Sequence, residues 1–246
     1  MSGAGTGTLV TVVPTDNNLL GIRQKFIELS GRINLASTAV TDYDTDAGAD
    51  FFIRGGSLDL DLEQDNLMSW AEHQEALAIG EYDIQIDYCK NVQEAYYLNA
   101  DGKMMPLTKK SYNYLIDEYP ELGNTDSGAP LYWAPYPTRR VPAQIISGRA
   151  VNVISVMIMP PTDEAITVSL YTKSYSYPLT DNDDENFWSL NFPHILILAA
   201  LRNLEGFYRN TQGYKDYDAI IDAKLIGLDK DLAEWAAAGS DLAMEG

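Results

Sequence analysis

Two histidines, His73 and His194, are the only imidazole groups in the chain. Neither has a second histidine at the spacing of a metal-binding pair, and the sequence EHQE around His73 is not the HExxH motif of zinc proteases. We therefore expect structural or solvent-exposed roles for both. The sequence Gly55-Gly56-Ser57 does not form the GxSxG nucleophile motif of hydrolases, and the glycines form no phosphate-binding or dinucleotide-binding motif. The sequence predicts no catalytic residue and no cofactor.

Carboxylates are densest in one short segment, which holds Asp181, Asp183, Asp184 and Glu185. A calcium-binding EF-hand that began at Asp181 would need glycine at its sixth position and glutamate at its twelfth. Asn186 and Phe192 stand there instead. We expect an acidic loop whose charge favours the positive end of the following helix, and no metal site. A metal-dependent hydrolase that uses Asp181, Asp183 and Glu185 stays open as an alternative.

The net charge is the unusual feature of the composition, because 36 acidic residues against 17 basic ones give −19. Such a surface repels phosphate backbones and disfavours tight binding of nucleic acid. It indicates either simple solubility or the lining of a passage through which DNA slides. The single cysteine, Cys89, excludes an intrachain disulfide and is expected to be a small buried hydrophobe. The longest apolar run, 195–201, is too short to cross a membrane, and the N-terminus does not resemble a secretory signal.

Aromatic side chains are concentrated in the middle of the chain, which has 16 tyrosines in all. Tyrosine and tryptophan are common in protein interfaces, but they also favour β-strands, and a carbohydrate-binding surface is a third interpretation. We expect interface positions at five residues, the last two on the final helix: Tyr132, Trp133, Tyr136, Tyr217 and Trp235.

The N-terminal part reads as two helices. Apolar residues at spacings of three and four predict a helix over 19–33, with Asp16 as its N-cap and one buried face: Leu19, Ile22, Phe26, Leu29 and Ile33. A loop rich in Asp, Thr and Gly follows over 38–50. A second helix over 47–64 would bury Phe51, Leu58 and Leu62, although two glycines weaken it and 58–62 alternates like a strand.

The middle part alternates with a period of two, which is typical of half-buried strands. Strands are expected over 82–88 and 92–99, paired with each other, with a tight turn at Asp101-Gly102. A short helix over 111–119 ends before Pro120. Further strands are expected in three segments, the last two joined by a proline turn at 160–163: 131–136, 150–159 and 165–175.

The C-terminal part is helical again. Pro193 begins a buried helix that continues over 195–208, and Gly213 is expected to break it. An amphipathic helix follows, with this apolar stripe: Tyr217, Ile221, Leu225, Leu228, Leu232 and Trp235. The tail, 236–246, is small and acidic and is expected to be loose unless a partner holds it. The chain is thus predicted to be α+β, a bundle of N- and C-terminal helices with an inserted antiparallel, sandwich-like β region. The expected divisions are 1–70, 71–185 and 186–246, the last packing with 14–70.

The order of these segments resembles the head-to-tail adaptor proteins of podovirus-like tailed bacteriophages, and residues 128–223 contribute most of the likeness. The sequences that correspond are Phe51-Phe52-Ile53-Arg54-Gly55-Gly56 in the second helix, Pro106-Leu107-Thr108-Lys109-Lys110-Ser111 before the short helix, Gly128-Ala129-Pro130-Leu131-Tyr132-Trp133, Val156-Met157-Ile158-Met159-Pro160-Pro161, Leu179-Thr180-Asp181, and Asn191-Phe192-Pro193 before the buried helix. No catalytic motif is among them, and the order of elements gives most of the resemblance.

The resemblance implies a structural virion protein and not an enzyme. It implies a ring of copies, a dodecamer in the familiar members, which binds the portal protein on one side and the tail tube or nozzle protein on the other. DNA would pass through the ring without specific binding during packaging and ejection, and the ring would lie at the virion neck after assembly in the host cytoplasm. Two alternatives stay open: another neck or tail component, such as a completion or tail-tube-associated protein, and a tyrosine-rich binding module.

Overall fold

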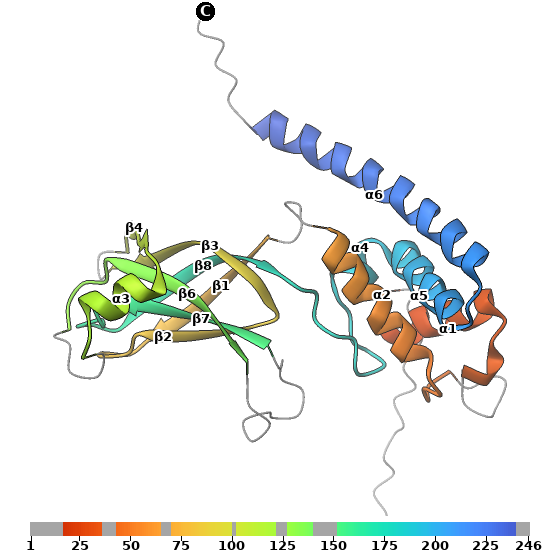
Figure 1. Ribbon diagram of the computed structural model, residues 1–246, viewed down its shortest axis with the longest axis horizontal. Helices are drawn as coiled ribbons and strands as arrows, with labels where there is room; N and C mark the ends of the chain where they lie inside the picture. Colours follow the sequence, from red (N-terminus) through yellow and green to blue (C-terminus); the bar gives the residue numbers. More distant parts are fainter. Residues whose placement is uncertain are drawn as a thin grey trace, which may run out of the picture. The chain divides into compact units, whose positions relative to one another are not determined.

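The computed structural model describes residues 17–35, 43–64, 70–99, 102–121, 127–139 and 152–239, the side chains at 137–139, 152, 229 and 231–239 excepted. The fold is α+β, and the chain divides into two compact units. Unit 1 combines the two ends of the chain, Met1–Gln64 and Ser176–Gly246, and its elements are helical. Unit 2, Asp65–Tyr175, holds the strands. Figure 1 shows how the chain leaves the first unit after α2 and returns to it after β8.

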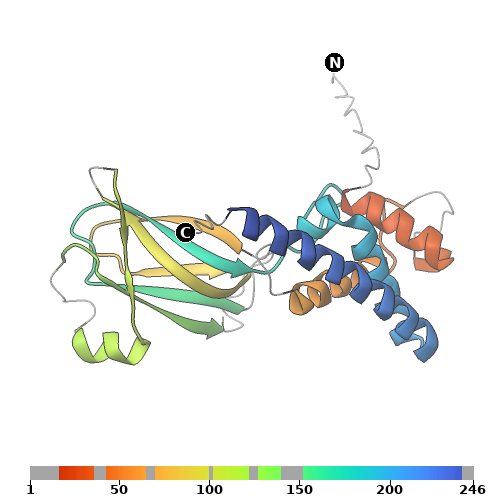
Figure 2. The same cartoon turned by 90° about the horizontal axis from the view of Figure 1, so that it is seen from above.

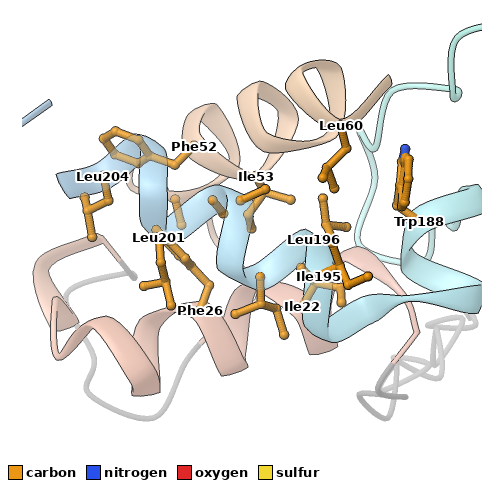
Figure 3. Packing of buried hydrophobic residues seen from close by; sticks show 14 of the residues in the cluster. Ile22, Phe26, Phe52, Ile53, Leu60, Trp188, Ile195, Leu196, Leu201 and Leu204 are labelled. Atoms are coloured by element: carbon orange, nitrogen blue, oxygen red, sulfur yellow. The ribbon is translucent and has the colours of Figure 1, made fainter. Parts of the chain in front are cut away.

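Unit 1 contains α1 (Leu19–Ser30), a 3-10 turn (Ile33–Leu35), α2 (Ala49–Glu63), α4 (Phe187–Asn191), α5 (Pro193–Phe207) and α6 (Thr211–Gly239). Helix α5 is central, as its nearly continuous apolar sequence predicts. Side chains from α1, α2 and α4 meet it in one core, which Figure 3 shows from close by. The labelled contributors are Ile22, Phe26, Phe52, Ile53, Leu60, Trp188, Ile195, Leu196, Leu201 and Leu204.

Helix α1 has a cap at each end. The Asn18 side chain accepts a hydrogen bond from the Gly21 N–H at 2.8 Å, and Gly31 ends the helix in a left-handed conformation with φ of 67°. The predicted N-cap, Asp16, lies outside the described residues. Because Gly31 redirects the chain, Ile33 leaves the helix and is exposed, as is Leu29 in the last turn. The predicted buried face is therefore wrong at these two positions.

Helix α2 is confirmed, but the face assigned to its interior is wrong. Phe51, Leu58 and Leu62 point outward, and the opposite face is buried: Phe52, Ile53, Gly56, Ser57, Leu60 and Asp61 among others. The two glycines, which lower the helix propensity of this segment, explain which face of α2 is buried. Without side chains, Gly55 and Gly56 allow α5 to approach closely at Asn203 and Ala200.

The described residues of unit 2 form two four-stranded sheets and one short helix. One sheet has the order β1 (Trp70–Leu77), β8 (Ile166–Ser174), β3 (Cys89–Leu98), β4 (Met104–Pro106). The other has the order β2 (Asp83–Asp87), β7 (Asn152–Met159), β6 (Tyr132–Arg139), β5 (Thr108–Lys109), in which only β5 and β6 are parallel. The two sheets share one apolar core, and helix α3 (Tyr112–Glu118) lies on the outer face of the second (Figures 1 and 2).

The sequence predicted the positions of the strands better than it predicted their pairing. The predicted pairing of 82–88 with 92–99 is wrong, because β2 pairs with β7 while β3 pairs with β8. Tyr88 joins them with a positive φ of 55°, and the chain crosses there from one sheet to the other. The two strands around the proline turn at 160–163 likewise belong to different sheets. Of the turn predicted at 101–102, Asp101 lies outside the described residues, and Gly102 has a φ of 76°.

The break between α5 and α6 falls earlier than predicted. The chain turns at residues 208–210, where Arg209 has a φ of 61°, whereas Gly213 lies in the first turn of α6. The predicted domain boundary at residue 185 is also late, because 176–185 belongs to unit 1. Ser176 binds Asp61 of α2 through both its N–H and its hydroxyl, at 2.8 and 2.9 Å.

Candidate interaction surfaces

The three aromatic residues expected to form an interface on β6 do not share a face. Side chains alternate along a strand, so Tyr132 and Tyr136 lie on one side of the sheet and Trp133 on the other. Trp133 is only 1% exposed and belongs to the core between the sheets. Its assignment as an interface residue is therefore wrong for this unit by itself, whereas Tyr132 and Tyr136 remain half-buried beneath α3.

The face around α3 is a cluster of tyrosines that contact one another. The rings of Tyr112 and Tyr136 lie 4.8 Å apart, those of Tyr114 and Tyr132 lie 6.2 Å apart, and the Lys110 ammonium lies 4.9 Å from the Tyr114 ring centre. The Tyr136 hydroxyl donates to Asp83 at 2.7 Å, and burial together with this carboxylate raises the Tyr136 pKa. The cluster first of all holds α3 on the sheet. Its exposed ring edges still offer amphipathic contact area.

The other two expected interface residues lie on α6. Tyr217 is half-buried and packs against the core of unit 1, to which Ile221 and Leu225 of the stripe belong, and Leu228 is also buried. Trp235 lies within the helix, but its side chain is not among those described. The stripe predicted for α6 is confirmed over its described part, where it covers α5. Beyond Leu228, the apolar stripe of α6 is a feature of the sequence alone.

The acidic loop before α4 is held by its own hydrogen bonds. The Asp184 carboxylate accepts from the Thr180 N–H, the Thr180 hydroxyl and the Asp181 N–H at 2.7, 2.7 and 2.8 Å. These bonds with Asp181 and Thr180 lower the Asp184 pKa. The following helix, α4, is capped by Asn186 through a capping box with Ser189 and has no acidic residue in its first turn, so the expected effect of the loop charge on α4 stays a prediction. The loop serves α1, since its backbone carbonyls at 184 and 182 accept from Leu19 and Leu20.

In the described part of the chain, no three His, Cys, Asp or Glu side chains are grouped so that they could hold a metal ion. His73 lies 3.6 Å from the Glu75 carboxylate on β1. His194 lies in the first turn of α5, and partial burial lowers its pKa. Within the same residues, none of the helices is long and apolar enough to span a membrane.

A buried arginine, which the sequence analysis missed, holds the start of unit 1 together. Arg23 is 2% exposed and binds both carboxylate oxygens of Asp50 at 2.7 and 2.8 Å. It also donates to the Tyr43 carbonyl and to the Asn182 side chain, both at 2.7 Å. One guanidinium thus joins α1, α2 and the acidic loop. The signal in the sequence was a charged residue between Leu19 and Phe26, inside the apolar stripe of a predicted helix.

A second arginine joins three helices in the same way. Arg202 of α5 is buried and contacts Glu63 of α2 and Asp218 of α6, each at 2.8 Å, with Asp59 at 3.6 Å. The Asp218 side chain lies at the edge of this contact and is 41% exposed. Both arginines have structural partners and are not exposed to a ligand.

Among the described residues of unit 1, two groups of exposed apolar side chains involve α2 and the end of α5. The outer row of α2 consists of Phe51, Leu58 and Leu62, with exposed fractions of 71%, 49% and 60%. The aromatic end patch consists of Phe51 with Phe207 and Tyr208 at the end of α5, of which Phe207 is 67% exposed. Both surfaces contain residues that a sequence pattern assigned to an interior. No family model matches this chain, and no curated protein sequence is significantly similar to it.

Proposed function

We propose that this chain is a structural virion protein, the head-to-tail adaptor that forms a ring between the portal and the tail of a tailed bacteriophage. The finer architecture, a helical bundle with an inserted sandwich-like β region, is part of the same proposal. The proposal assigns the chain no reaction. Its partners are further copies of itself, the portal protein and a tail tube or nozzle protein.

The outer row of α2 is the observation that carries the proposal. The opposite face of α2 already packs against α5, so the helix does not need three large apolar side chains on its outside to fold. Leu58 and Leu62 are one turn apart, and neighbouring exposed apolar side chains are typical of surfaces that bind another protein. The row therefore supports a chain that functions within an assembly, and the resemblance supplies the kind of assembly.

The order of elements also supports the adaptor. The segments that resemble adaptor proteins occupy α2, the β4–β5 connection before α3, the aromatic strand β6, the end of β7 and the start of α5. The net charge of −19 supports a passage for DNA, because like-charge repulsion keeps a duplex from binding to the wall.

The test is electron microscopy of virions whose copy of this chain has an epitope tag. The proposal expects the tag at the neck, directly below the portal. A tag further down the tail would assign the chain to another neck or tail component and not to the adaptor. Virions that lack the chain would overturn the virion assignment.

A variant tests the carrying observation directly. The double substitution Leu58→Gln with Leu62→Gln should leave the free energy of unfolding within about 0.5 kcal/mol of the parent, since both side chains are exposed. It should also prevent incorporation into virions. The matched control is Leu190→Gln on α4, 47% exposed, which should be incorporated normally. Normal incorporation of the double variant would contradict the role of the outer row.

A further inference from the structure

The aromatic end patch is built around one buried ring. Phe52 lies at its centre, with Phe51 at 5.3 Å and Phe207 at 5.6 Å between ring centres, both edge to face. Tyr208 continues the series at 5.5 Å from Phe207. Three exposed aromatic side chains are thus held in contact with each other or with Phe52, in contrast to the isolated apolar residues that are normal on surfaces.

Two arginines and one acid lie at the rim of this patch, although the protein as a whole is strongly acidic. The Arg32 guanidinium lies 4.3 Å from the Tyr208 ring centre, and the exposed Arg209 follows Tyr208 in the chain. Glu205, an acid at this end of α5, accepts a hydrogen bond from Asn210 at 2.6 Å. The patch therefore fits an apolar surface that has acidic neighbours, such as an acidic amphipathic helix.

The C-terminal segment of this chain has that chemistry. From residue 228 to residue 246 it contains five acids, Asp229, Asp231, Glu234, Asp241 and Glu245, against one base, Lys230, a net side-chain charge of 1 − 5 = −4. Beyond the buried Leu228, the apolar residues Leu232 and Trp235 follow each other at a spacing of three, which is the spacing of one helical face. The segment belongs to α6 up to Gly239.

The segment cannot reach the patch of its own chain. Tyr208 lies just before Thr211, where α6 begins, and the 29 residues of α6 extend about 43 Å from there. The seven residues after Gly239 (246 − 239) span at most about 25 Å when fully extended. The length of the helix thus assigns the contact to another molecule.

We propose that the C-terminal segment 228–246 of one copy binds the aromatic end patch of a second copy. The surfaces on the two copies differ, so the contact is heterologous and repeats from one copy to the next, which generates a ring where the rotation closes. This inference deepens the proposed function. That the repeated contacts close into a ring rests on that function.

The test measures self-association of the full chain by sedimentation velocity. Concentrations from about 1 to about 100 micromolar cover the dissociation constants of weak contacts between copies of one protein. The parent chain should form oligomers larger than a dimer. Phe207→Asp on the patch and Trp235→Ala on the segment should each be at least about tenfold weaker in association, a loss of about 1.4 kcal/mol. The control Ile79→Asp alters an equally exposed side chain in unit 2 and should associate like the parent.

Mixing the two variants gives the decisive result. A Phe207→Asp chain keeps its segment and a Trp235→Ala chain keeps its patch, so an equal mixture should form heterodimers and stop there. Association of either variant at the strength of the parent, or no heterodimer in the mixture, would overturn the inference. A parent chain that stays monomeric would also overturn the inference. A tag at the neck of virions would still support the adaptor, so failure of the inference can be distinguished from failure of the proposed function.

Discussion

Gly56 of α2 lies directly against the backbone of Ala200 in α5. A Cβ atom at Gly56 would be 2.7 Å from the Ala200 nitrogen and 3.0 Å from the Ala199 carbonyl carbon, closer than side chains normally approach. Both neighbours are backbone atoms within a helix, so they cannot rotate away. The glycine is thus explained by the close contact of two helices, a gain that offsets its poor helix propensity of about 1 kcal/mol.

Gly56→Ala should lower the free energy of unfolding by about 1 to 3 kcal/mol, because the added methyl group forces α2 and α5 apart. Gly227→Ala in α6 is the control: nothing lies within 4 Å of its added Cβ, and the better helix propensity should give a gain of up to about 1 kcal/mol. Urea denaturation followed by tryptophan fluorescence measures both. A Gly56→Ala chain as stable as the parent would refute the close contact.

Helix α2 shows what a sequence pattern can and cannot decide. Both of its faces are apolar: Phe51, Leu58 and Leu62 lie on one, and Phe52, Ile53 and Leu60 lie on the other. The period of 3.6 predicted the helix correctly, but it does not say which face meets the core. That choice depends on where α5 can approach, and the glycine pair determines it.

The strands teach a related lesson. Alternation located β6, β7 and β8, but pairing depends on contacts between distant segments, which a period of two does not encode. The alternation also bears on the candidate interface. Adjacent residues of a strand point to opposite faces, so Tyr132 and Trp133 cannot both face one partner. Strand β1 was missed because its sequence, WAEHQEAL, consists mostly of residues that favour helices.

Asp61→Ala should destabilise unit 1. The buried Asp61 carboxylate accepts hydrogen bonds from the Trp188 indole at 2.8 Å and from Ser176, and the substitution leaves these donors without their acceptor. We expect a loss of about 2 to 3 kcal/mol and a change in the near-UV circular dichroism of Trp188. The exposed control Asp222→Ala should stay within about 0.5 kcal/mol of the parent. Equal effects of the two substitutions would argue against this role for Asp61.

The acidic loop should give part of the stability a pH dependence. Hydrogen bonds from Asp181 and Thr180 lower the Asp184 pKa below its ordinary 3.8, so the charged form stabilises the fold. This stability is complete above pH 3.8 and is lost as the pH falls through the folded pKa. Asp184→Asn should therefore be less stable than the parent at pH 7, with the difference disappearing in acid. Asp183→Asn removes the same charge without these bonds, and thermal unfolding across pH should show no such convergence for it.

Cys89 should be nearly inert in the folded chain. Burial between the sheets raises the pKa of its thiol from 9.0 to about 11, which lowers the thiolate fraction at pH 8 by about 100-fold. Because the thiolate is the reacting species, labelling by a water-soluble disulfide reagent should be at least about 100-fold slower in buffer than in urea. Raising the pH from 8 to 9 should still increase the native rate about tenfold, since the folded pKa lies above both values. The rate is followed by absorbance of the released thiolate. Fast stoichiometric labelling of the folded chain would mean that the core between the two sheets opens readily at β3.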